Sequence, residues 1–168
     1  MLWVKTFFGI LFQTILLGIF LYLPALTLNW SDAFLLLTIH FLITILASAY
    51  LLVVKPESIE ARMNYDSKTQ PKEDRLATAL MFSAIFVGLS LAPIDIFHLN
   101  LSSSFEGSIK NIGLAIYIIG MLLFMASLNA NEFAETTVNI QEERGQKVID
   151  TGIYSMVRHP MYTGFIFF

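Results

Sequence analysis

The sequence predicts an all-α protein that crosses a membrane several times, with four transmembrane helices and the start of a fifth. Hydrophobic residues make up 56% of the 168 residues and charged residues only 14%, whereas an average soluble domain has about 25% charged residues. The mean hydropathy is +0.69. In addition, the apolar residues are gathered into long blocks that contain almost no charge.

Four of these blocks are long enough to cross a bilayer: residues 2–28, 33–54, 76–93 and 112–130. A helix of about 20 residues spans a hydrocarbon core of roughly 30 Å. Because backbone polar groups must be paired inside lipid, the blocks are predicted to be helices. Lys5 is the one charged residue within them. The first block is longer than the apolar part of a signal peptide and lacks a small-residue cleavage site, which disfavours that alternative.

Lysine and arginine residues alternate between few and many along the connecting segments. Residues 29–32 contain none, residues 55–75 contain five, residues 94–111 contain one and residues 131–158 contain three. Because basic residues favour the cytoplasmic side, this alternation predicts a cytoplasmic N-terminus with segment 131–158 on the same side. Segment 55–75 has as many acidic as basic residues and is predicted to be a solvated, partly helical loop without chemistry.

Several function classes are excluded or disfavoured by composition. The chain has no cysteine, which excludes disulfides, zinc–thiolate sites and cysteine nucleophiles. A net charge of -3 offers no basic surface for nucleic acid. Asp95 and His98 are too few ligands for a metal, so no metal site is expected. His40 lies inside the second block, where a hydrogen bond from a neutral imidazole to a carbonyl is the favoured interpretation over a functional role.

Small residues recur at helical spacing in two blocks. Ala84, Gly88 and Ala92 are each four residues apart, and Gly113 and Gly120 are two turns apart. Small side chains let neighbouring helices approach closely in a membrane. We therefore expect both sets to lie in helix–helix contacts.

The segment from residue 131 to the end differs in kind, because a long polar stretch leads directly into an apolar run. It concentrates the following side chains: Gln141, Arg144, Gln146, Lys147, Tyr154, Arg158, His159 and Tyr162. Gly145 and Gly152 are predicted to lie in turns. The chain is accordingly divided into a four-helix transmembrane region, residues 1–130, and a polar segment, residues 131–168, that leads into an incomplete fifth helix.

Pro160 predicts that this fifth helix begins near His159, since proline is favoured in the first turn. The unpaired N–H groups of a helix start can hold an anion. Arg158 adds a charged fork for a carboxylate or phosphate, and His159 is a donor that titrates near neutral pH. Tyr154 and Tyr162 offer ring faces to a base or a cation.

These groups suit a ligand with an aromatic base, a carboxylate and a positive centre, as in S-adenosylmethionine. A lipid headgroup or a nicotinamide dinucleotide would use many of the same groups. Arginine, histidine and tyrosine are also common at helix ends in membranes, where they hold the helix at the interface. Residue spacing alone leaves ligand binding and interfacial anchoring both open.

The run GQKVIDTGIYSMVRHPMYTG, residues 145–164, resembles the cofactor-binding segment of the isoprenylcysteine carboxyl methyltransferase and phospholipid methyltransferase superfamily. The resemblance implies a membrane enzyme that transfers a methyl group from S-adenosylmethionine to a lipid-like acceptor, such as an isoprenylcysteine carboxylate. The acceptor would enter from the bilayer and the cofactor from the cytosol. The implied cofactor-binding residues are Gln141, Gln146, Lys147, Val148, Ile149, Tyr154, Arg158, His159, Pro160, Met161, Tyr162 and Gly164.

Members of this superfamily continue beyond the Arg-His-Pro helix. A further span and a Glu-rich motif supply an acidic cofactor contact and an arginine near the acceptor. The resemblance therefore implies that the catalytic residues lie beyond Phe168. We expect the present chain to be an N-terminal portion of a longer protein and to be inactive as it stands.

Two alternatives remain. Membrane reductases of the sterol-reductase type, which use NADPH, have a related Arg-His-Pro-x-Tyr segment. They usually have asparagine after the proline and an acidic residue after the glycine, where this chain has Met161 and Phe165. The other alternative is a non-enzymatic helical module that only packs against partners in the membrane.

Overall fold

The computed structural model describes the chain except for residues 64–71, 102–106, 132, 134–147 and 168. All regular elements of the described residues are helical, which confirms the predicted all-α class. They are α1 (Leu2–Ala25), α2 (Ser31–Val54), α3 (Pro56–Met63), α4 (Lys72–Ile94), the π-helical turn η1 (Asp95–Leu99), α5 (Ser108–Ala130), the 3₁₀ turn η3 (Gly152–Ser155) and α6 (Pro160–Phe167).

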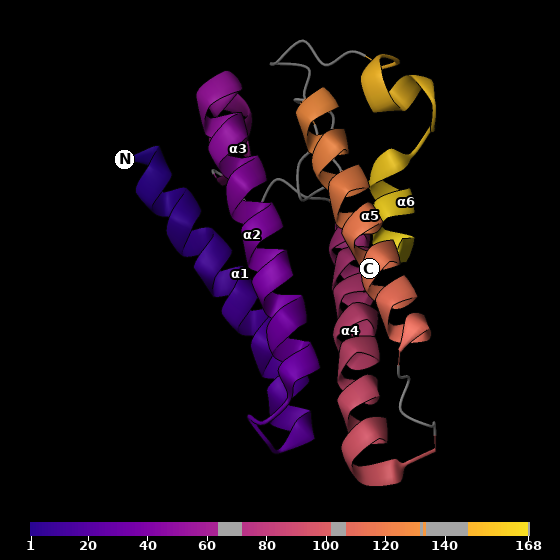
Figure 1. Cartoon of the computed structure of the whole chain (residues 1–168). Helices are drawn as coiled ribbons and strands as arrows, with labels where there is room; N and C mark the ends of the chain where they lie inside the picture. Colours follow the sequence, from indigo (N-terminus) through magenta and orange to yellow (C-terminus); the bar gives the residue numbers. More distant parts are fainter. Residues whose placement is uncertain (64–71, 102–106, 132, 134–147, 168) are drawn as a thin grey trace.

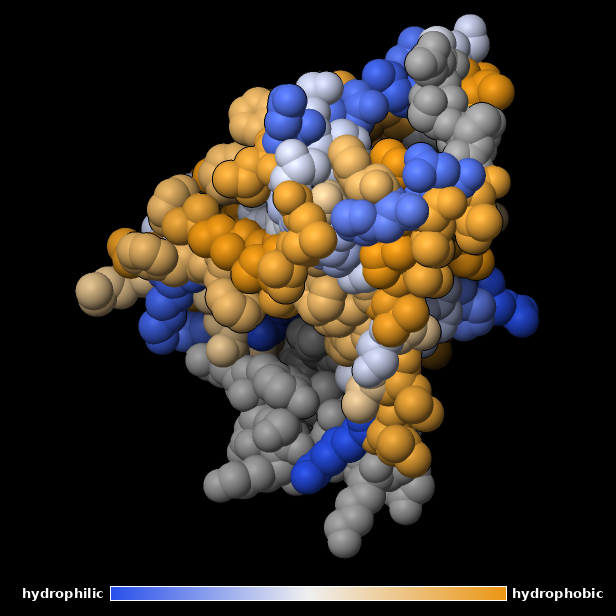
Figure 2. All heavy atoms as spheres, turned by 90° about the horizontal axis from the view of Figure 1, so that it is seen from below, coloured by the Kyte–Doolittle hydropathy of each residue, from blue (hydrophilic) through white to orange (hydrophobic). Residues whose placement is uncertain are grey.

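Four helical stretches of the described residues are long and apolar enough to cross a membrane, as predicted. They are Leu2–Ala25, Ser31–Val54, Arg75–Leu99 and Ser108–Ala130. Large apolar side chains such as Phe8 and Phe12 are exposed to the surroundings, and much of the face shown in Figure 2 is hydrophobic. So much exposed apolar surface is rare on soluble monomers and is typical of a lipid-facing protein.

The spans run alternately up and down in Figure 1, and α6 runs back down beside α5. Helix α1 packs against α2 and α4, while α5 packs against α2 and, most extensively, α6. The N-terminus, α3 and η3 lie at the same end of the bundle, at the top of Figure 1. The connection at residues 26–30 and the π-helical turn η1 at the end of α4 lie at the other end.

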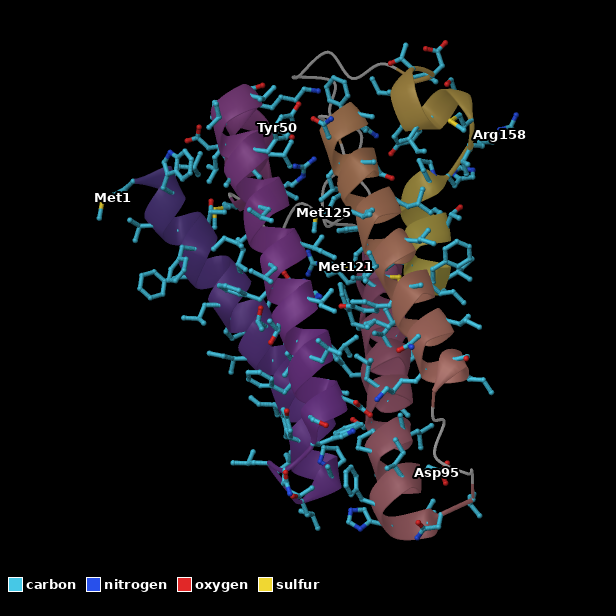
Figure 3. All side chains as sticks on the ribbon, in the orientation of Figure 1. Met1, Tyr50, Asp95, Met121, Met125 and Arg158 are labelled. Carbon is cyan, nitrogen blue, oxygen red and sulfur yellow. The ribbon has the colours of Figure 1, made fainter. Side chains whose placement is uncertain are left out.

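The third span is longer than predicted, because the helix continues through Pro93 into the π-helical turn η1. The N–H of Asn100 donates to the carbonyl oxygen of Asp95 at 2.7 Å and closes this wider turn. Asp95 and His98, which the block boundaries assigned to the connecting segment 94–111, therefore lie in the last helical turn. Asp95 is labelled at the lower end of Figure 3. His98 Nε2 lies 2.7 Å from the carbonyl oxygen of Pro24 and donates to it.

The prediction for the small residues holds at one position and fails at others. A Cβ atom on Gly120 would lie 2.9 Å from the carbonyl oxygen of Gly164, so α5 and α6 touch backbone to backbone there. A Cβ atom on Gly113 or Gly88 would have nothing within 4 Å. Gly88 and its neighbours on the same stripe, Ala84 and Ala92, are exposed in this chain. Spacing identifies a stripe of small residues but not whether another helix faces it.

The prediction that His40 bonds to a carbonyl was wrong. Its Nδ1 atom lies 2.7 Å from the hydroxyl oxygen of Tyr117, on the facing helix α5. The packing of α2 against α5 brings the Tyr117 hydroxyl within hydrogen-bond distance of the imidazole, and the sequence alone does not show which helix faces His40.

Candidate functional site at the end of helix α5

The residues with predicted binding roles are divided by the structure into three groups. Gln141, Gln146 and Lys147 lie outside the described residues. Val148 and Ile149 are in the irregular stretch before η3, where Val148 is almost fully exposed. The others, from Tyr154 to Gly164, lie in η3, in the short link after it, and in α6.

The turn η3 is built by a glycine with positive φ. Gly152 has φ 60°, a conformation that other residues adopt only with strain. The hydroxyl of Ser155 donates to the carbonyl oxygen of Gly152 at 2.7 Å, and the N–H of Tyr154 donates to that of Thr151 at 3.2 Å. A Cβ atom on Gly152 would lie 3.6 Å from that of Ala130. The turn therefore lies directly against the last residue of α5.

Tyr154 points from η3 toward the end of α5. The side-chain amide Nδ2 of Asn131 donates to the Tyr154 hydroxyl at 3.5 Å. Asn131 is the C-cap residue of α5, and its Oδ1 accepts from the N–H of Phe133 at 2.9 Å. Because Oδ1 is occupied in this way, the Nδ2 side of the amide is the one that faces the tyrosine. The hydroxyl of Tyr154, one of the residues predicted to bind the cofactor, is thus fixed by a hydrogen bond from the C-cap residue of α5.

Two basic residues of segment 55–75 bind the end of α5. The segment is partly helical, as predicted, but its described part is not fully solvated, because Ser58 and Ile59 of α3 are buried. Lys55 Nζ donates to the carbonyl oxygen of Asn129 at 2.6 Å. Arg62 Nη2 donates to those of Leu128 at 2.9 Å and Asn131 at 3.3 Å. The last carbonyl groups of a helix have no partner within it and carry partial negative charge, so cations are favourable there.

Helix α6 begins at Pro160, as the first-turn preference of proline predicts. The carbonyl oxygen of His159 accepts from both the N–H and the hydroxyl of Thr163, at 3.0 and 3.1 Å. Pro160 itself is buried.

The charged and aromatic side chains at this helix start face outward. His159 and Tyr162 are exposed, with ring centroids 5.8 Å apart. Arg158 is also exposed and projects from the outer side of the link between η3 and α6 (Figure 3). These three side chains form one accessible group at the N-terminal end of α6.

Gly164 faces away from this exposed group. A Cβ atom there would lie 2.8 Å from the carbonyl oxygen of Gly120 and 3.0 Å from the backbone nitrogen of Phe124. The phenyl rings of Phe124 and Phe165 complete the contact, with centroids 5.0 Å apart. The absence of a side chain at Gly164 therefore allows close packing of α6 on α5, which holds the Arg-His-Pro cluster near η3.

A cavity of about 400 Å³ lies elsewhere, between the first turns of α2 and α5. Its walls are mostly apolar and include Leu36, Tyr117 and Phe167. Asp32 and Lys110 also line it and form an ion pair of 2.9 Å. Tyr117 and Asn131, the C-cap of α5, are fourteen positions apart along the helix, a rise of about 21 Å. The cavity is therefore distinct from the group around η3.

Asn131, Lys55 and Arg62 were not among the residues singled out by sequence. Asn131 ends the fourth apolar block and Lys55 ends the second, so their positions at span boundaries were a usable signal. No local pattern reveals that Arg62 reaches α5, because 66 residues separate it from Leu128 in sequence. Among the described residues there is no cluster of three or more His, Asp or Glu side chains that could hold a metal.

Comparison with known families finds a similarity in the C-terminal part of the chain. Residues 109–168 match the family model described as phospholipid methyltransferase. This confirms the resemblance to the membrane methyltransferase superfamily over α5, η3 and α6. The match also extends it, because α5 had been recognised only as an apolar block. No curated protein and no solved structure matches the chain significantly.

Proposed function

Because residues 109–168 match the phospholipid methyltransferase family, we propose that this multi-pass membrane protein transfers a methyl group from S-adenosylmethionine to a lipid-like acceptor. The observation that carries the proposal is the match itself, which includes the whole Arg-His-Pro-x-Tyr-x-Gly cluster. An isoprenylcysteine carboxylate is one such acceptor, and a phospholipid amine is another.

The described residues have chemistry that fits each part of the proposed cofactor. The Arg158 guanidinium and the N–H groups at the start of α6 suit its carboxylate. The rings of Tyr154 and Tyr162 suit its adenine base or its positive sulfonium centre. Gln141, Gln146, Lys147, Val148 and Ile149 are proposed as further contacts from the family resemblance.

S-adenosylmethionine supplies an electrophilic methyl group, which an acceptor carboxylate, thiol or amine takes by in-line displacement as the carbon–sulfur bond breaks. Such a transfer needs little acid–base help, and holding the two reactants in line can lower the barrier by several kcal/mol, up to about 7–11 in the best cases. The role proposed for Arg158, His159 and the tyrosines is therefore to bind and orient. Packing of α6 on α5 through Gly164 would keep this group in place.

The active side of the membrane is proposed to be the cytoplasmic one. The N-terminus, α3 and η3 share one end of the bundle in Figure 1. Lys55, Arg62 and Arg158 lie at that end, while Lys110 lies at the other. This distribution supports a cytoplasmic location for η3 by the positive-inside rule, and a water-soluble methyl donor would then reach the site from the cytosol.

The proposal is tested by titration calorimetry of the complete protein, purified in detergent, with S-adenosylmethionine and its demethylated product. We expect a Kd in the micromolar range, weakened about tenfold or more by His159→Ala, which corresponds to about 1.4 kcal/mol. Met156→Ala is the matched control, since this exposed side chain lies in the same segment outside the predicted site.

Absence of heat with either ligand would contradict the methyltransferase proposal. Oxidation of NADPH in the presence of a lipid with a conjugated ketone would instead favour the reductase alternative. The family match argues against that outcome.

A further inference from the structure

Helix α3 is an eight-residue amphipathic helix that contacts three spans at the end of the bundle carrying η3. Its Ile59 is buried in a cluster with Leu51 and Leu52 of α2, against which Leu2 of α1 and Leu128 of α5 also pack. The opposite face carries Glu57 and Glu60, which are exposed. One face of α3 thus joins α1, α2 and α5.

Two further contacts tie α3 into the bundle. The sulfur of Met63 accepts from the hydroxyl of Thr6 at 3.6 Å. Arg62 reaches the end of α5, where its single Nη2 group donates to the carbonyl oxygens of Leu128 and Asn131. Hydrogen bonds from a charged donor are stronger than neutral ones. The position of the last turn of α5 is therefore coupled to the position of α3.

Asn131 connects this contact to η3. Its backbone oxygen accepts from Arg62 at 3.3 Å, and its side-chain amide donates to the Tyr154 hydroxyl at 3.5 Å. The amide cannot easily rotate away, because its oxygen is held by the N–H of Phe133 at 2.9 Å. A continuous chain of hydrogen bonds thus runs from α3 through the C-cap of α5 to η3.

We propose that Arg62 is a positioning residue for η3, and that it acts through Asn131 to hold Tyr154 in its orientation. Arg62 lies on a different element from the proposed binding group and acts on it only through α5. The identity of the ligand rests on the function proposed above, whereas the positioning itself is a property of the fold.

A lysine in place of Arg62 would not serve equally well. A guanidinium presents donors in a rigid planar fork, while an ammonium is a compact charge on a flexible stem. Arg62→Lys keeps the charge near the helix end but not the fixed geometry toward Leu128 and Asn131. Its effect should therefore lie between those of the native residue and Arg62→Gln.

The test uses the absence of cysteine in the chain. Cysteines introduced at the exposed positions Glu60 on α3 and Met156 beside η3 can be spin-labelled selectively in the complete protein. Pulsed electron paramagnetic resonance then measures the distribution of distances between α3 and η3. We expect one narrow distribution, broadened by Arg62→Gln and, to a smaller extent, by Arg62→Lys. Glu57→Gln, on the exposed face of α3, should leave it unchanged.

A distribution that stays narrow in Arg62→Gln would overturn the proposal. If Arg62→Gln fails to fold, as judged by circular dichroism, Asn131→Ala decides the matter, since it removes only the side-chain link. A narrow distribution in Asn131→Ala would then also overturn it.

Calorimetry separates this inference from the proposed function. If the native protein binds S-adenosylmethionine, Arg62→Gln and Asn131→Ala should each bind it about tenfold more weakly, without loss of helicity. A native protein that does not bind S-adenosylmethionine would defeat the proposed function, while the distance measurement would still decide the positioning role.

Discussion

The two halves of α5 are both mostly apolar but differ in what they contact. The half from Gly120 to Ala130 touches α6 backbone to backbone, lies against η3 and has its final carbonyl groups bound by Lys55 and Arg62. The half that begins at Ser108 borders a cavity and has an exposed ion pair at its start.

The contrast shows which polar and small residues stabilise the protein. Half-exposed ion pairs such as Lys110–Asp32 typically contribute about 0–1 kcal/mol. A cation bound to otherwise unpaired carbonyl groups at a helix end contributes about 0.3–1 kcal/mol when exposed and up to about 2 kcal/mol when partly buried, as at Lys55 and Arg62. The C-terminal half of α5 is therefore the half that the rest of the chain holds in place.

The largest expected effect comes from filling the close contact between α5 and α6. Gly120→Ala would bring a Cβ atom within 2.8 Å of the Cβ of Phe167, and overpacking of this kind costs about 1–3 kcal/mol. Gly113→Ala, on the same helix with open space, should change stability by about 0.5 kcal/mol or less. Unfolding by sodium dodecyl sulfate in mixed micelles measures both. Equal stability of the two variants would refute the contrast between the halves.

An intermediate effect is expected at the contact between α5 and α2. Tyr117→Phe removes the hydroxyl that His40 Nδ1 contacts at 2.7 Å. Among the described residues, His40 Nε2 has no hydrogen-bond partner, so the imidazole would lose its one observed polar contact. We expect a loss of about 1 kcal/mol in the free energy of unfolding, measured by unfolding with sodium dodecyl sulfate in mixed micelles. Tyr50→Phe, at an exposed position on α2, serves as the control and should leave stability unchanged.

The smallest effect is expected from the two lysines that lie at opposite ends of α5. Lys55→Gln removes a bond to the carbonyl oxygen of Asn129 and should cost about 0.3–1 kcal/mol. Lys110→Gln removes only an exposed pair and should cost about 0.5 kcal/mol or less, falling further at high salt. Thermal unfolding at two salt concentrations distinguishes them. A larger loss of stability in Lys110→Gln than in Lys55→Gln would contradict the conclusion that the C-terminal half of α5 is the better held.

Local features of the sequence were enough to predict much of the fold. The apolar block lengths predicted the four spans, and Pro160 predicted the start of α6. These predictions succeed because span length depends on the bilayer and because proline restricts its own φ, neither of which requires knowledge of a neighbour. The third span was underestimated because Pro93 ordinarily ends a helix, and here the helix continues into the turn that Asn100 closes.

By itself, the sequence determined the membrane class, the number of spans and the position of the Arg-His-Pro cluster at the start of a helix. Only the tertiary structure decided that Gly120 packs closely while Gly113 does not, that His40 bonds to Tyr117, and that Arg62 binds the end of α5. The physical reason is that span formation is a local balance between side chains and lipid. Which small residue is covered and which polar group is paired depend on the neighbouring helix that faces them.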